Sequence, residues 1–195
     1  NVSNVTNMYF TFEAALAFNL PLSDWNVGNV TNMQGMFYNA SSFDQPLTWV
    51  VSEVVNMHQM FMHASSFNQS LNWDVSKVTN MMWMFNTATS FNGDISNWDV
   101  SVVTTMVHMF SEATSFNQPL NWNLSNGPNL GGMFYGATSF NQPLNHWNVS
   151  NVTNMNSMFM HASSFNQPLN DWNVGSVTHM DQMFSAATSF NQPLN

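Results

Sequence analysis

A repeat of 24 or 25 residues runs through this chain and restricts it to repeat architectures. Trp recurs at this spacing at seven positions, and a Phe follows each of these seven after 18 positions. A unit this short cannot bury its own apolar face, so neighbouring units must stack to form a shared core. We therefore expect the recurring Trp side chains to form a buried ladder: Trp25, Trp49, Trp73, Trp98, Trp122, Trp147 and Trp172.

Eight copies of the repeat cover residues 1–195, which predicts a single domain without a linker. The first copy is the least regular, but it keeps the apolar register of the others. The predicted repeats are approximately 1–24, 25–48, 49–72, 73–97, 98–121, 122–146, 147–171 and 172–195.

Each unit contains two apolar patterns of different period. Leu71, Trp73 and Val75 alternate with polar residues, which is typical of a half-buried strand. Between Val78 and Ala88 the apolar residues recur every three or four positions, which predicts a short helix. The sequence therefore predicts an α/β repeat solenoid of eight strand-plus-short-helix units with a parallel sheet.

The best-kept units resemble BspA-like leucine-rich repeats. The resemblance is carried by the stretch from Trp147 to Met155, the pair Met158-Phe159, Ala162, and the stretch from Ser164 to Leu169. It implies a right-handed leucine-rich-repeat solenoid at a cell surface or in the extracellular space, often adhesive, and no catalytic residues carry over from it. One unit departs from the pattern between Gly127 and Gly132, where we expect a broken or irregular helix.

The charge of the chain excludes several classes of function. One basic residue, Lys77, stands against ten acidic ones, and the formal net charge is −9. Nucleic-acid binding depends on clustered Lys and Arg, and docking on anionic membranes also needs basic residues. No apolar run reaches the roughly 18 residues of a membrane span, so neither nucleic acid nor membrane insertion is expected.

Metal and cofactor sites find little support in the sequence. Met-x-x-Met pairs such as Met33/Met36 and Met155/Met158 could hold Cu(I), but they recur in step with the core residues and predict packing. The six His are scattered, and Cys is absent. We expect no metal, no cofactor and no catalytic site.

The outward positions of the strand form a possible binding face. Asp74 and Asp99 occupy equivalent positions in adjacent units and could share a Ca²⁺ with Asn oxygens, although solvated carboxylates are the simpler interpretation. The predicted face consists of Asn72, Asp74, Asn97, Asp99, Asn121 and Asn123.

Asn is abundant and supports two further predictions. An Asn follows the last Phe of most units, and aligned Asn side chains can form a ladder that satisfies backbone groups at turns. This ladder would contain Asn68, Asn92, Asn117, Asn141, Asn166 and Asn191. Asn-x-Ser/Thr motifs outside it are possible N-glycosylation sites: Asn1, Asn4, Asn29, Asn39, Asn123, Asn148 and Asn151.

These patterns predict a non-enzymatic, extracellular structural protein, a repeat array of a cell-surface or extracellular fibre. Apolar residues at both ends of the array, such as Val5 and Leu194, suggest that copies stack head to tail into filaments. The alternative is a cell-surface adhesin or binding module that recognises protein or glycan through the strand face.

Overall fold

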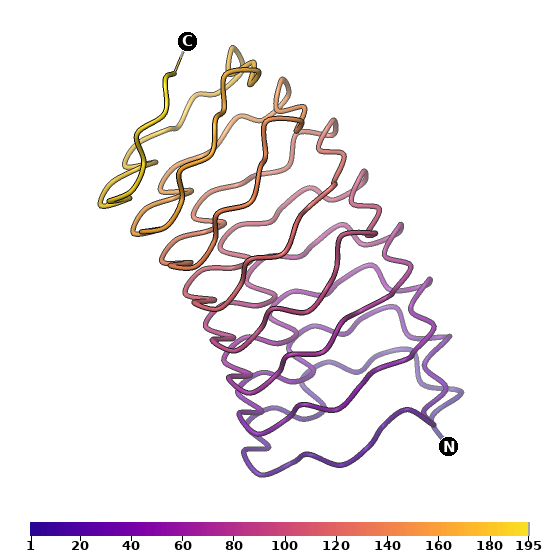
Figure 1. Cartoon of the computed structure of the whole chain (residues 1–195). Helices are drawn as coiled ribbons and strands as arrows, with labels where there is room; N and C mark the ends of the chain where they lie inside the picture. The colour runs from indigo at the N-terminus through magenta and orange to yellow at the C-terminus, as the bar shows by residue number, and fades with distance from the viewer. Residues whose placement is uncertain (195) are drawn as a thin grey trace.

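The computed structural model describes residues 1–194 and shows a stack of similar coils, one for each repeat (Figure 1). Colour in Figure 1 runs steadily along the stack, so each coil lies between its two neighbours in sequence. Residues 24 or 25 positions apart therefore lie above one another. One hydrophobic cluster runs through the coils from Met8 to Met183.

Regular secondary structure is almost absent from residues 1–194. No residue there is in an α-helix or in a strand longer than a single bridge. The bridges are parallel and join equivalent positions of successive coils: Asn7 with Asn32, Asn32 with Asn56, Asn56 with Asn80, Asn80 with Thr105, Thr105 with Asn129, and Asn154 with His179.

The segment around each Trp is extended and alternates as predicted, but it is not a strand of a sheet. Leu71, Trp73 and Val75 are buried, while Asn72 and Asp74 are exposed. Neighbouring segments are joined by the indole N–H of each Trp, which donates to a Leu or Ile carbonyl of the previous coil at 2.8–3.2 Å. Stacked Trp rings are 6.3–6.5 Å apart, wider than the ~4.8 Å spacing of paired strands.

The predicted Trp ladder is confirmed for six of its seven members. Trp49, Trp73, Trp98, Trp122, Trp147 and Trp172 are each at most 8% exposed. Trp25 is half-buried and packs against the edge of the core.

The helix predicted between Val78 and Ala88 is absent, because that segment folds as consecutive turns. The N–H of Met84 donates to the Met81 carbonyl, and the N–H of Ala88 donates to that of Phe85. Every second backbone N–H group from Met81 to Thr87 donates to a backbone carbonyl of the next coil, at 2.8–3.1 Å, and not to a carbonyl of its own coil. Turns four residues apart place side chains inward at the same spacings as a helix, so the apolar pattern could not separate the two structures.

Each of these turn segments contains two residues with left-handed backbone, at the third and seventh positions from the first inward Met or Leu. A left-handed residue ends a helix, which is the local reason that none forms. The first set comprises Phe10, Gly35, Gln59, Trp83, His108, Gly132, Ser157 and Gln182. The second comprises Ala14, Asn39, His63, Thr87, Glu112, Gly136, His161 and Ala186.

The predicted Asn ladder is confirmed. The side-chain oxygen of each member accepts the backbone N–H of the equivalent residue in the next coil at 2.7–3.0 Å, from Asn68 to Asn191. Asp44 and Asn19 extend the ladder toward the N-terminus with the same contact. The five Met-x-x-Met pairs from Met33/Met36 to Met155/Met158 are buried in the core, as the packing interpretation predicted, whereas Met180 of the last coil is 41% exposed.

The irregular unit deviates at two adjacent positions, Gly127 and Pro128, instead of losing its whole fold. Pro128 has no N–H, so Asn129 makes the bond to the Thr104 carbonyl at 3.0 Å. Gly127 has a φ of 68°, and a Cβ there would lie 2.3 Å from the Asn151 carbonyl oxygen. From Leu130 onward the turns and their bonds to the next coil are the same as elsewhere.

Candidate functional site

The predicted binding face lies on the extended segments of three adjacent coils. All six of its residues are exposed: Asn72, Asp74, Asn97, Asp99, Asn121 and Asn123. The amide of Asn97 donates to the side-chain oxygen of Asn72, so the structure brings this pair into contact across two coils. Asn72 also lines a hollow of about 240 Å³ with Thr48, Trp49 and Ser70.

The carboxylates of this face are engaged in local turns. Asp74 accepts the backbone N–H and the hydroxyl of Ser76 at 3.1 and 2.7 Å, and these hydrogen bonds lower its pKa. Asp99 accepts the N–H of Ser101, and hydrogen bonding to that residue lowers the pKa of Asp99, although partial burial and the like charge of Asp74 act to raise it. Within residues 1–194 no three His, Asp or Glu side chains come together in one group.

The predicted N-glycosylation sites differ in their exposure and in whether the side-chain amide nitrogen already donates a hydrogen bond. Asn1, Asn4, Asn29, Asn123, Asn148 and Asn151 are exposed, and Asn39 is half-buried. The amide nitrogens of Asn29 and Asn151 donate to the carbonyls of Ser3 and Ser125. Asn123 and Asn148 use only their oxygens, as caps for Ser125 and Ser150.

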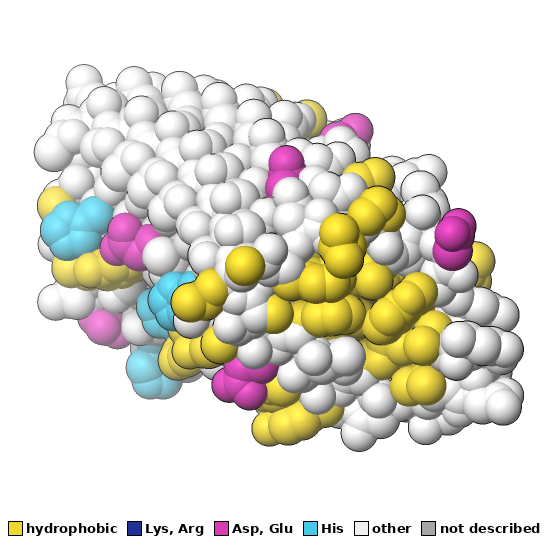
Figure 2. Space-filling view, turned by 90° about the horizontal axis from the view of Figure 1, so that it is seen from below, with side chains coloured by type: hydrophobic (Ala, Val, Ile, Leu, Met, Phe, Trp, Pro, Cys, Tyr) yellow, Lys and Arg dark blue, Asp and Glu magenta, His cyan; other side chains and the backbone are white. Residues whose placement is uncertain are grey.

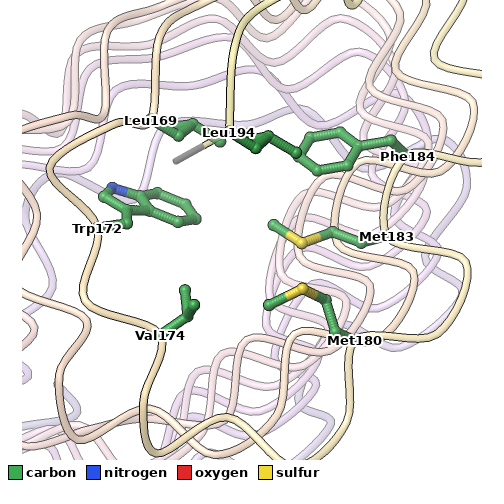
Figure 3. A pocket seen from close by; sticks show the side chains of 7 residues that line it. All are labelled: Leu169, Trp172, Val174, Met180, Met183, Phe184 and Leu194. Atoms are coloured by element: carbon green, nitrogen blue, oxygen red, sulfur yellow. The ribbon is translucent and has the colours of Figure 1, made fainter.

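An apolar face closes the C-terminal end of the described stack (Figure 3). Trp172 and Val174 project from one side of the coil, and Met180, Met183 and Phe184 project from the other. Together with Leu169 and Leu194 they line a hollow of about 100 Å³. Leu194, which the sequence placed on this edge, is 62% exposed, and Phe190 is half-buried against Phe184.

The N-terminal end is also apolar. Figure 2 views the molecule from below and shows hydrophobic side chains gathered in one region. Among the first coil's residues, Val2, Val5, Phe12 and Phe18 are only partly buried against the core. Met8 of the same coil is instead buried, at 3% exposure.

A groove on the turn segments was not found by the sequence analysis. It has a volume of about 190 Å³ and spans four coils, with the lining Met62, Trp83, Asn86, His108, Ser111 and Tyr135. The groove was missed because this segment was predicted to be a helix. In the structure, turn residues of four successive coils lie side by side and together form the groove. The sequence did contain one indication of the groove. Trp83 and His108 occupy a position that is Gly in two other repeats, at Gly35 and Gly132.

Two partly buried histidines lie on the turn segments, and one of them, His108, lines the groove. Burial lowers the pKa of His58 and of His108 below the ordinary value for histidine. Lys77 pairs with Glu53 at 2.7 Å, and both side chains are about half exposed. Within residues 1–194 no helix is long and apolar enough to span a membrane.

The sequence matches one family three times along its length, over residues 1–72, 47–127 and 120–195. That family is described as "Mycoplasma protein of unknown function, DUF285". Comparison with curated proteins gives no match. Overlapping matches to one family that together cover the whole chain are what an array of repeats produces, and the chain belongs to the DUF285 family.

Proposed function

We propose that this protein is a non-enzymatic structural repeat protein whose copies join head to tail into filaments. The observation that carries the proposal is the match between its two ends, both in hydrogen-bonding groups and in aromatic columns. The occupant of each end face is a second copy of this chain.

The backbone groups at the two ends are complementary. In every junction between coils, N–H groups of one turn segment donate to carbonyls of the following coil, as from Ser157 to Asp181 at 2.8 Å. The last described coil therefore presents the N–H groups at Met180, Gln182, Phe184 and Ala186 without a following coil among residues 1–194. The first coil presents the carbonyls that would receive them, those of Asn7, Tyr9, Thr11 and Glu13.

The aromatic columns are complementary in the same register. Phe12 and Phe184 are the first and last members of one column, in which successive rings lie 5.4–5.7 Å apart and within 8° of parallel. Phe18 and Phe190 begin and end a second column. A copy stacked on the C-terminal face would continue both columns and cover the hollow lined by Trp172 and Met183. Such a head-to-tail contact does not close on itself, so it produces filaments.

We place these filaments outside the cell or on its surface, as parts of a fibre. The support is the resemblance of the repeats to BspA-like leucine-rich repeats, which are surface proteins. That finer family name and its leucine-rich-repeat solenoid are part of the proposal.

A surface-exposed binding module is the second candidate function. The row of exposed Asn and Asp side chains on the extended segments, with the hollow at Asn72, favours it. In this case the predicted binding face on the extended segments would bind a protein or a glycan, and the end faces would not associate.

Sedimentation velocity and negative-stain electron microscopy of the 195-residue chain test the main proposal. We expect the sedimentation coefficient to rise with concentration and linear particles to appear, each with the width of one coil stack. A single monomeric species at every concentration would contradict the proposal and favour the binding module.

A further inference from the structure

The groove on the turn segments has the properties of a ligand site, and it lies away from the end faces that would join copies. Its lining residues come from coils three to six: Met62, Trp83, Asn86, His108, Ser111 and Tyr135. Most of its wall is apolar or aromatic, with a few polar groups, as in binding sites for small molecules.

The aromatic residues of the groove are arranged differently from those of the core. Trp83 meets His108 at 75° with ring centroids 6.2 Å apart, and His108 meets Tyr135 at 70° and 6.2 Å. The Phe and Trp rings of the core columns instead stack nearly parallel, face against face. Trp83 also meets His58 at 64° and 6.4 Å, and Tyr135 meets His161 at 80° and 5.5 Å, so each ring lies between two edge-to-face neighbours. Edge-to-face contacts cover less of a ring than parallel stacking does, and both Trp83 and Tyr135 are only half-buried, so part of each ring remains exposed.

The groove is also lined by polar side chains that could form hydrogen bonds with a ligand, and no Asp, Glu or Lys is among them. The side-chain oxygen of Asn86 accepts the Thr87 hydroxyl at 3.0 Å, which leaves the amide N–H donors of Asn86 for a ligand. Ser111 is the buried polar residue of the described chain, at 4% exposure. Burial lowers the pKa of His108, and a hydrogen bond to the Gly132 backbone opposes that shift, so one ring nitrogen is already engaged and the other is left for a ligand.

Two residues of the groove occupy positions where glycine would be less strained. Trp83 and His108 have φ values of 58° and 52°, and the equivalent positions two and one coils away are Gly35 and Gly132. The indole nitrogen of Trp83 is also buried without a hydrogen-bond partner. Left-handed backbone is shared by this position in every coil, so the unsatisfied indole nitrogen is what sets Trp83 apart. A buried polar atom without a partner disfavours Trp for folding alone, and such costs gather at functional sites.

We propose that this groove binds one ring of an uncharged sugar, at the end or within a chain of a glycan. The apolar C–H face of the sugar would lie on the Trp83 ring, and its hydroxyl groups would bond with Asn86, Ser111 and His108. A ring-sized hollow with aromatic walls, neutral donors and no cation suits a neutral sugar and disfavours anionic ones. Lys77, the single basic residue of the chain, is not part of the lining.

Saturation-transfer NMR with methyl glycosides of glucose, galactose, mannose and N-acetylglucosamine tests this proposal. We expect at least one to bind with a Kd in about the millimolar range, as suits an open site for one ring. Trp83→Gly should weaken binding by at least about tenfold while the chain keeps its folded stability, because glycine suits the left-handed backbone there.

Gln182→Gly is the matched control, since it makes the same change at the equivalent position of the last coil, outside the groove. It should leave sugar binding unchanged. Asn86→Ala removes the amide donors without altering the aromatic wall. It should weaken sugar binding and leave the fold of the coil stack unchanged. The proposal is overturned if none of the four glycosides binds, or if binding survives Trp83→Gly unchanged. A purely structural role for Trp83 would instead appear as lost stability with binding unaffected.

Discussion

The indole N–H of Trp98 donates a hydrogen bond to the carbonyl oxygen of Leu71, one coil earlier in the stack, at 2.8 Å. The same ring is 3% exposed and stacks on Trp122 at 6.3 Å. One side chain thus fills the core and replaces the backbone ladder that a sheet would have supplied at this side of the coil. The equivalent bond recurs from Trp49 to Trp172, so the column holds the whole stack together.

Truncation of a central Trp should therefore be severe. Trp98→Ala should lower the free energy of unfolding by about 3–5 kcal/mol, because it opens a cavity and leaves the Leu71 carbonyl without its donor. Trp98→Phe retains most of the ring and isolates the lost hydrogen bond, at about 1–3 kcal/mol. Urea denaturation followed by fluorescence measures both, and a loss below about 1 kcal/mol for Trp98→Ala would mean that the ring is not part of the core.

The Asn ladder gives a second prediction with a natural control. The side-chain oxygen of Asn117 accepts the N–H of Asn141 at 3.0 Å and the amide of Gln142 at 3.1 Å. Asn117→Ala should cost about 1–3 kcal/mol of unfolding free energy, because both donors lose their acceptor. Asn117→Asp keeps the acceptor, as Asp44 does in its own coil, and should cost much less. Equal losses of unfolding free energy in the two variants would show that the side-chain oxygen of Asn117 does not provide the stabilisation.

Left-handed positions without glycine offer sites where the chain can be stabilised. Ser157 has a φ of 53°, so Ser157→Gly should raise the free energy of unfolding by up to about 1 kcal/mol through relief of strain. The neighbouring substitution Asn156→Gly, at a position with ordinary backbone, should instead lower it by roughly 0.5–1 kcal/mol. Thermal unfolding of the pair decides the matter, and a loss at both positions would contradict the turn geometry described above.

Stability should also fall in mild acid because of two histidines. The folded-state pKa values of His58 and His108 lie below the ordinary value of 6.5, so the unfolded chain takes up their protons first. Their contribution is complete above pH 6.5 and is lost as the pH falls through that value toward the folded-state pKa values. Urea midpoints measured between pH 7.5 and 5 should decline, and the decline should be smaller in the double variant His58→Gln, His108→Gln. An unchanged decline in that variant would assign the effect to other groups.

The sequence predicted the register of the molecule better than its local structure. Fixed spacing of Trp, Phe and Asn was enough to predict the Trp column and the Asn ladder, since side chains in an exact repeat must meet their own kind in the next unit. The helix prediction failed because Met81, Met84, Phe85 and Ala88 have the spacings of a helix face and of consecutive turns alike. Only backbone angles separate the two, and non-glycine residues such as Trp83 give no warning that they are left-handed.

The same difference separates the candidate sites that the sequence predicted from the one that it did not. Exposure of Asn72, Asp74 and their neighbours was predictable from alternation along the extended segment. The groove at Trp83 and His108 was not, because it depends on how turns from four coils lie against one another. Engagement of Asp74 by Ser76 was also outside the pattern, since it is a bond within one turn.

Mixing two blocked variants tests head-to-tail assembly most directly. Phe12→Glu places a charge on the N-terminal face alone, and Phe184→Glu places one on the C-terminal face alone. Each variant by itself should remain monomeric in sedimentation velocity, because a buried, unpaired carboxylate opposes every junction. An equimolar mixture should form a one-to-one dimer and nothing longer, since one open N-terminal face meets one open C-terminal face. A mixture that stays monomeric while the unmodified chain forms filaments, or single variants that still form filaments, would contradict the account.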